Sequence, residues 1–221
     1  MTETRELIET LVSATAPVKR LRSPFVRTLH WVTGGAAVIA ALALFLGPRP
    51  DWATQIEVPE FQCGLLASMA TGALAALAAF TVSAPDRSRA WLLLPAPAAC
   101  LWLGTIGVGC LGHWVPLDTG AMAPREVLLC VSTLLLSSVP LSVLMFWMLR
   151  HTAGLRPFGA LPAAGLAVGA FTAAALSVVH RFDSSLLVLV WGIGATGLVM
   201  AIDATVGRAV LDGIRRRRYP V

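Results

Sequence analysis

The residue types with the most specific chemistry in this chain are its four cysteines and four histidines. Cys63, Cys110 and Cys130 lie near those ends of three apolar segments that we expect on one side of a membrane, facing an oxidising compartment. A disulfide between Cys110 and Cys130, or between Cys63 and Cys110, would sense oxidants through its redox state. The alternative is that each cysteine is a small apolar packing residue. No C-x-x-C pair occurs, which argues against a zinc ribbon or a thioredoxin-like motif.

Histidines and carboxylates are too scattered to predict a metal or haem site. His30 lies at one end of the first apolar segment, whereas His113 and His180 lie near the opposite face. Two histidines on one side are suitable metal or haem ligands, but no further ligand joins them at the required spacing. Asp203 lies near a segment end, within reach of Arg208 or water. Since no nucleophile elbow or pair of catalytic acids is present, we expect neither an enzyme nor a cofactor.

A strongly apolar chain carries these residues. Of its 221 residues, 57% are hydrophobic and 13% are charged, and the mean hydropathy is +0.76. A soluble domain carries about 25% charged residues. The composition therefore excludes both a water-soluble enzyme and a disordered chain, and it makes lipid the simplest environment for the surface.

Six apolar stretches reach the length of about 20 residues that a helix needs to cross a bilayer. The connections between them are short and rich in proline, glycine and charge. We therefore expect an all-α, polytopic membrane bundle of six transmembrane helices within residues 28–206, between an amino-terminal tail (1–27) and a basic carboxyl tail (207–221). The expected spans are residues 28–46, 61–82, 91–111, 126–149, 158–180 and 185–206.

The basic residues are distributed unevenly between the two sides of the expected bundle. The chain has 17 Lys and Arg against 12 Asp and Glu, a net charge of +5. Fourteen of the basic residues lie in the two tails and in the second and fourth connections, and three lie on the other side. Because cytoplasmic segments are enriched in Lys and Arg, both termini are predicted to be cytoplasmic, in a bacterial inner membrane. The basic excess therefore does not indicate direct binding of nucleic acid.

Tryptophan and glycine positions suggest how the spans sit and pack. Tryptophans near span ends are predicted to be interfacial anchors. Glycines within spans are predicted to allow close approach of helix backbones. The tryptophans are Trp31, Trp52, Trp91, Trp114 and Trp147, and the glycines are Gly104, Gly107, Gly109, Gly165 and Gly169.

The amino-terminal tail contains a short amphipathic helix pattern. Thr2 or Thr4 can cap it, and Pro17 ends it. Its apolar stripe would either lie on the inner leaflet, held by basic residues, or dock into a groove of a partner protein. Acidic residues near its start favour the protein partner. The stripe is Leu7, Ile8, Leu11 and Val12. Lys19, Arg20 and Arg22 would hold it on a lipid surface, and Arg20 and Arg22 would support contact with a protein partner.

Several segments together resemble the negative regulator of sigma F (NrsF-like) family of six-span anti-sigma factors, over nearly the full length. These segments are ELIETLVSATAPVKRLRSP (6–24), LGPRPDW (46–52), Arg125, Cys130, LSSVPL (136–141), residues 165–180, Asp183, Trp191 and the pair Gly207 and Arg208.

The resemblance implies a membrane regulator without enzymatic activity. Its cytoplasmic tail would bind an extracytoplasmic-function sigma factor, hold it away from RNA polymerase, and release it on an envelope or oxidative stress signal. The family pairs a cysteine at the position of Cys130 with a second one where this chain has Arg181. The thiol mechanism is therefore not carried over. A small transporter or channel, and a membrane thiol-redox protein, are the alternative functions.

Overall fold

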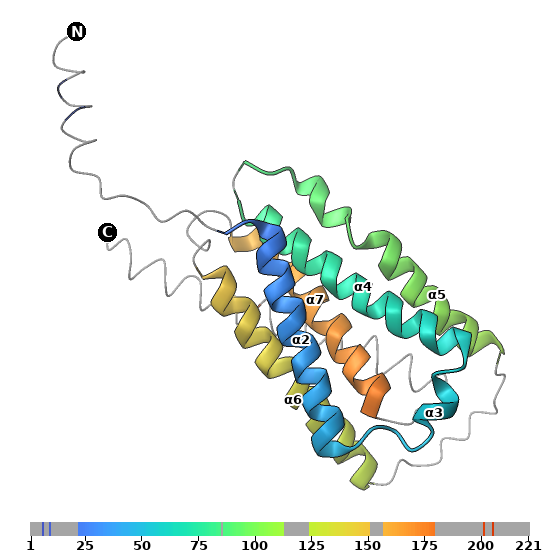
Figure 1. The fold of residues 1–221 in the computed structure, drawn as a ribbon. Helices are drawn as coiled ribbons and strands as arrows, with labels where there is room; N and C mark the ends of the chain where they lie inside the picture. The colour runs from blue at the N-terminus through green and yellow to red at the C-terminus, as the bar shows by residue number, and fades with distance from the viewer. Residues whose placement is uncertain are drawn as a thin grey trace.

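A computed structural model of the chain describes residues 22–84, 86–112, 124–150 and 157–179, together with Glu6, Glu9, Ala201 and Thr205. Within these residues the fold is all-helical, as expected, and contains no strand. The elements in chain order are α2 (Pro24–Leu46), α3 (Trp52–Gln55), α4 (Pro59–Val82), the 3₁₀ helix η1 (Arg89–Leu93), α5 (Ala96–Gly112), α6 (Pro124–Leu149) and α7 (Pro157–Val179) (Figure 1).

Five segments are long and apolar enough to cross a membrane, and they coincide with the first five expected spans. The described residues thus support five spans and not six. The sixth expected span, residues 185–206, lies outside them apart from Ala201 and Thr205. The five segments are Pro24–Leu46, Pro59–Val82, Arg89–Gly107, Val131–Leu149 and Ala160–Val179.

Local chemistry sets where these helices begin and end. α2 begins at Pro24, earlier than the expected residue 28, because the hydroxyl of Ser23 accepts a hydrogen bond from Val26 N at 3.4 Å. It ends at Gly47, whose φ of 84° suits glycine. The third expected span is divided, because Pro95 has no N–H to continue the helix and α5 begins directly after it.

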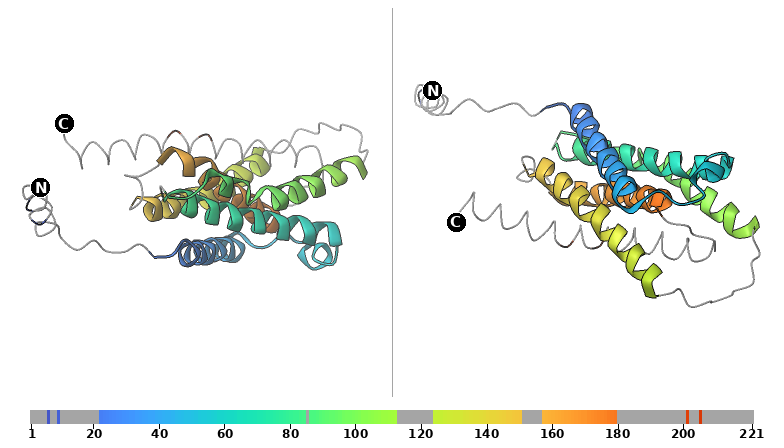
Figure 2. Two further views of the ribbon diagram at one scale, coloured as in Figure 1. Left: turned by 90° about the horizontal axis from the view of Figure 1, so that it is seen from above. Right: turned by 60° about the horizontal axis from the view of Figure 1, so that its bottom comes forward.

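α7 occupies the centre of the described bundle. It packs most extensively against α4, and also against α6 and α2, while α5 packs against α4 (Figures 1 and 2). α2 runs antiparallel to α4 and α6 and parallel to α7. The start of α2 therefore meets the ends of α4 and α6, and the connection after α2 meets the end of α7. We call these two ends of the bundle the Arg27 end and the Arg49 end, after the residues described below.

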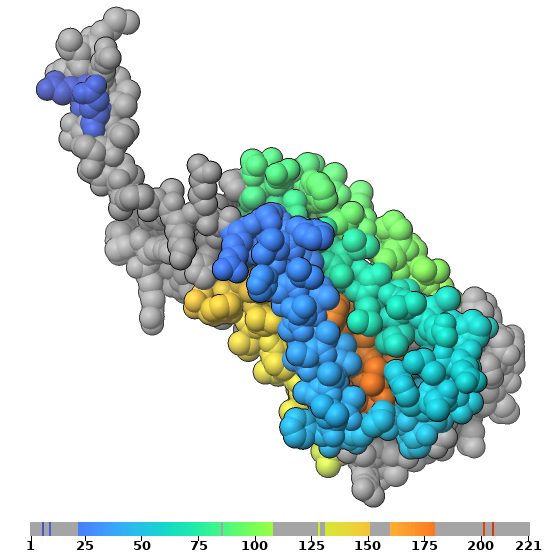
Figure 3. All heavy atoms as spheres, viewed as in Figure 1, coloured from blue at the N-terminus to red at the C-terminus, as the bar shows by residue number. Residues whose placement is uncertain are grey.

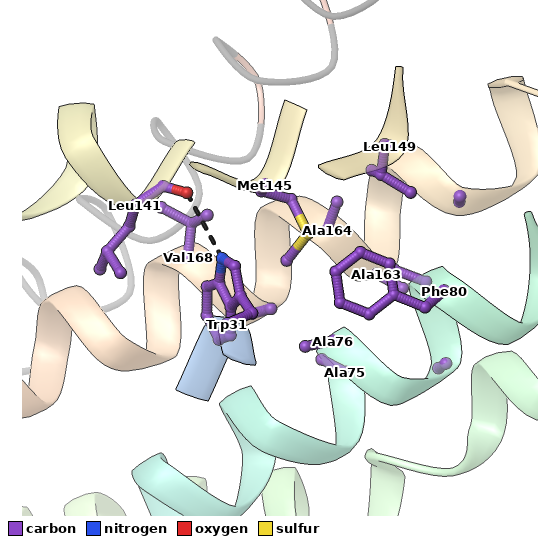
Figure 4. Close-up of a cluster of buried hydrophobic side chains, with 14 of the residues drawn as sticks. Trp31, Ala75, Ala76, Phe80, Leu141, Met145, Leu149, Ala163, Ala164 and Val168 are labelled. Atoms are coloured by element: carbon purple, nitrogen blue, oxygen red, sulfur yellow. Dashed lines mark hydrogen bonds between the residues drawn. The ribbon is translucent and has the colours of Figure 1, made fainter. Parts of the chain in front are cut away.

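Alanines line the contact between α4 and α7. Ala75, Ala76 and Ala79 of α4 are fully buried, as are Ala167 and Ala174 of α7. Small side chains let two helix backbones approach closely, which is how helices associate where water supplies no driving force. Larger side chains fill the space next to this contact, with Phe80, Leu141 and Met145 almost completely buried (Figure 4).

Phe171 of α7 is held between two glycines from other helices. A Cβ placed on Gly35 of α2 would lie 2.6 Å from Phe171 Cδ1, and one on Gly72 of α4 would lie 2.4 Å from Phe171 Cδ2. Only glycine leaves room for the ring at these positions. Close packing is not found at Gly104 or Gly107 of α5, where nothing described lies within 4 Å of an added Cβ. Among the described residues, the predicted close packing is thus found at Gly35 and Gly72 but not at Gly104 or Gly107.

Trp31 is a core residue, and the prediction that it anchors the chain at a membrane interface was wrong. It is 0% exposed and its indole N–H donates to Leu141 O at 3.4 Å (Figure 4). Its ring meets Phe171 edge-to-face, with centroids 4.9 Å apart. Trp91 and Trp147 are exposed, as an interfacial position requires. Trp114 lies outside the described residues.

Large apolar side chains cover much of the outer surface, where α2, α4 and α5 lie side by side on one face (Figure 3). Phe45 is 88% exposed and Leu44 84% exposed on α2, and Leu93 of η1 is 71% exposed. Apolar patches of this extent are rare on soluble monomers. The surface therefore suits contact with lipid.

Candidate functional sites

Most of the predicted partner-binding residues lie outside the described residues. These are Leu7, Ile8, Leu11, Val12 and Arg20, whose roles stay predictions. Arg22 is described and exposed, two residues before α2. Glu6 and Glu9 are helical and exposed, as residues on the polar side of an amphipathic tail helix should be.

The cysteines are found on three different helices. Cys63 of α4 and Cys100 of α5 are exposed free thiols, so the interpretation of them as buried packing residues was wrong. Cys110 lies in α5 and Cys130 in α6, but the structure does not describe their side chains. Both proposed disulfides include Cys110, so neither is tested. Among the described residues no cluster of three potential metal ligands occurs.

Arg27 joins three helices at one end of the bundle. It lies in the first turn of α2 and is 8% exposed. Its Nη2 donates to the carbonyl of Met148 in the last turn of α6. Its guanidinium also lies over the ring of Phe80, near the end of α4, at 4.5 Å from the centroid. Arg27 therefore fixes the start of α2 against both neighbouring helix ends.

The chemistry of helix ends explains why an arginine suits this position. The last carbonyls of α6 have no partner within the helix and carry partial negative charge, which a cation complements. A planar guanidinium can donate to such a carbonyl and stack on an aromatic ring at the same time, which an ammonium group cannot do. The cap at Ser23 and the bond from Arg27 N to Ser23 O, at 3.2 Å, fix the first turn that carries the side chain.

Arg49 forms a second cluster at the opposite end. Its guanidinium binds both carboxylate oxygens of Asp51, at 2.8 and 2.7 Å, and lies 5.5 Å from the centroid of the Phe61 ring. Its backbone N–H donates to Val178 O in the last turn of α7 at 3.0 Å. Arg49 is 7% exposed. The cluster attaches the connection between α2 and α4 to the end of the central helix.

Exposed charge is mostly basic at one end and acidic at the other. Arg22, Arg87, Arg89 and Arg150 are exposed at the Arg27 end together with Asp86, whereas Glu57 and Glu60 are exposed in the connection at the Arg49 end and at the start of α4. The sequence pattern predicted this asymmetry. It did not predict the two arginine clusters, because Arg27 and Arg49 were counted only as charges. An arginine at the edge of an apolar span, and the R-x-D spacing, were the available signals.

The family comparison covers the bundle and the later part of the tail. The sequence model of the family NrsF, negative regulator of sigma F, matches residues 11–212, which include helices α2 to α7. The chain belongs to this family. Members of the NrsF family are named for negative regulation of a sigma factor, which identifies a sigma factor as the partner. No curated protein and no solved structure matches the chain significantly.

Proposed function

We propose that this NrsF protein is a non-enzymatic, membrane-bound anti-sigma factor. It sequesters an extracytoplasmic-function sigma factor through its amino-terminal tail and releases it on an envelope or oxidative stress signal. The observation that carries the proposal is the family match over residues 11–212. The described helices add an apolar bundle with five segments able to anchor the tail to a bilayer.

The apolar stripe of the tail is suited to binding a protein. An isolated helix of about a dozen residues is marginal in water and needs a surface to cover its apolar stripe. A groove on a folded partner provides that surface, and helix-in-groove recognition uses side chains at this spacing. Leu7, Ile8, Leu11 and Val12 would enter the groove, and Arg20 and Arg22 would contact acidic groups at its rim.

The charge asymmetry supports a cytoplasmic position for the tail. The described arginines exposed at the Arg27 end lie on the side where the tail enters α2, and basic residues are retained on the cytoplasmic side of bacterial inner membranes. A cytoplasmic tail can reach a sigma factor, whereas a tail on the other side cannot.

Replacing Leu7 and Leu11 together with aspartate tests the tail assignment. Two carboxylates on the stripe would have to be desolvated in an apolar groove, so the variant should lose the sigma factor while remaining in the membrane. The measurement is co-purification of the full-length chain, solubilised in detergent, with mass spectrometry of the bound protein.

A matched control places the same two charges on the opposite face, as Thr10→Asp with Ser13→Asp. This control should retain the sigma factor. If the Leu7→Asp and Leu11→Asp variant binds as well as the unaltered chain, the stripe is not the binding surface. If the unaltered chain recovers no sigma factor and instead supports substrate-dependent flux, the transporter is the correct function.

A further inference from the structure

The contacts of Arg27 connect the helix bundle to the tail. The tail enters α2 only a few residues before Arg27, and Ser23 caps the first turn of the helix there. The side chain holds this turn against α6 through Met148 O and against α4 through Phe80. The place at which the tail joins the bundle therefore depends on the positions of the ends of α4 and α6.

Arg27 also lies where its contacts can be exchanged for others. At the end of the bundle a guanidinium can extend into the interface, where water and phosphate groups replace the carbonyl and the ring. Met148 O lies in the last turn of its helix and can accept from water instead. Separating the two groups therefore leaves neither the guanidinium nor the Met148 carbonyl without a hydrogen-bond partner.

The opposite end of α2 is attached to the central helix. Arg49 follows α2 directly and its N–H donates to Val178 O of α7, while Phe171 of α7 fits against Gly35 of α2. A displacement at the end of α7 therefore acts on α2 through packed contacts. Because packed contacts shift as units, such a displacement reaches the Arg27 end without a flexible intermediate.

We propose that Arg27 is a conformational latch that controls presentation of the tail to its partner. When the latch is closed, the contacts of Arg27 hold the start of α2 against α4 and α6, and the tail binds its partner. A shift of α2 relative to these helices opens the latch, and the open state lowers the affinity of the tail for its partner. This inference rests on the proposed anti-sigma function and supplies its means of regulation. Arg27 is a positioning residue and does not contact the partner.

The test uses the full chain in lipid nanodiscs and the sigma factor that co-purifies with it. Arg27→Met removes the hydrogen bond and the charge but keeps an apolar side chain of similar length. It should weaken sigma-factor binding by about tenfold, within the range typical of coupling between sites. Arg27→Lys keeps the charge without the planar fork and should bind with intermediate affinity. Arg89→Met removes an exposed charge from the same end of the bundle and should bind normally.

The geometry of the latch is measured separately from binding. Spin labels are placed at positions 25 and 150, which are exposed on α2 and just after α6, in a chain whose cysteines are replaced by alanine. The mean distance between the labels should increase and its distribution should broaden with Arg27→Met, and both should stay unchanged with Arg89→Met. Phe80→Leu, which leaves Arg27 in place but removes the aromatic ring, should give a smaller change in the same direction.

The possible outcomes separate the latch from the function. A distance change with unaltered affinity would overturn the latch, and so would unaltered distances in both Arg27 variants. Should Arg27→Met fail to fold, the decision rests on Arg27→Lys and Phe80→Leu, which must change distance and affinity together. Failure of the proposed function instead appears as no sigma factor bound by the unaltered chain, whatever the distances show.

Discussion

At the scale of single residues, Phe171 determines how closely three helices approach. Its ring is fully buried, meets Trp31 edge-to-face, and occupies the space left by Gly35 and Gly72. An added methyl group at Gly72 would contact both the ring and the backbone, since it would lie 3.2 Å from Ala167 O. Neither neighbour can move freely in a close-packed interior.

Gly72→Ala should therefore lower the free energy of unfolding by about 1–3 kcal/mol, the usual cost of overpacking. Gly104→Ala, where nothing described lies within 4 Å of the added carbon, should be neutral or stabilising by up to about 1 kcal/mol. Thermal unfolding in detergent, followed by circular dichroism, compares the two. Adding Phe171→Leu to Gly72→Ala should recover part of the loss. Equal midpoints for the two alanine variants would contradict the packing described here.

At this scale the sequence predicted an apolar, helical chain from its composition, but it did not predict which residues contact one another. Trp31 lies near a span end, which is typical of an interfacial anchor, but its acceptor on Leu141 lies 110 residues later in the chain. Periodicity and spacing report which residues share a face of one helix. They do not report which other helix covers that face. The same limit concealed the roles of Arg27 and Arg49.

At the scale of elements, the connection between α2 and α4 is built around an ion pair. Arg49 and Asp51 are two residues apart, and their side chains are 8% and 20% exposed. Removing one member leaves the other without its partner in a poorly solvated place, which costs more than the pair contributes. The pair keeps α3 and the start of α4 next to the end of α7.

Arg49→Met and Asp51→Asn should each destabilise the protein by about 2 kcal/mol, less than for a fully buried pair because Asp51 retains some solvent. The double variant should lose less than the sum of the two, because neither charge is then left alone. A double-mutant cycle on the thermal unfolding midpoint measures this. Asp86→Asn at the exposed pair with Arg87, where N and O are 3.7 Å apart, should change stability by less than about 1 kcal/mol. Strict additivity at Arg49 and Asp51 would argue against the pair.

Element boundaries show what apolar length can and cannot predict. The five described spans were expected at nearly the correct positions, since a run of about 20 apolar residues is a strong signal. The early start of α2 depends on the cap at Ser23, and the break before α5 on Pro95. Hydropathy averages over a window and does not register single capping or breaking residues.

At the scale of the whole molecule, the uneven distribution of charge between the two ends predicts how the bundle is oriented across a membrane. The described connection that contains Arg87 and Arg89 lies at the Arg27 end, and Glu57 lies in the connection at the Arg49 end. If the Arg27 end is cytoplasmic, these two connections lie on opposite sides of the inner membrane.

Single cysteines introduced into the two connections test this orientation in a background without the four native cysteines. Glu57→Cys should react with a membrane-impermeant maleimide in intact spheroplasts, and Asp86→Cys should react only after lysis. Both positions are exposed, so accessibility within the protein is matched. The reverse labelling pattern would place the tail outside the cytoplasm and would exclude it as a sigma-factor binding site.

The latch contact has a consequence for how the chain is made. Arg27 and its acceptor on Met148 are separated by 121 residues. At synthesis rates of about 5–20 residues per second, α2 therefore waits roughly 6–24 seconds before α6 emerges. During that interval the arginine must be accommodated by water and lipid headgroups. A tail that binds firmly only when the latch is closed would retain its partner well only after most of the bundle has assembled, so incomplete chains would sequester less of it than the complete protein.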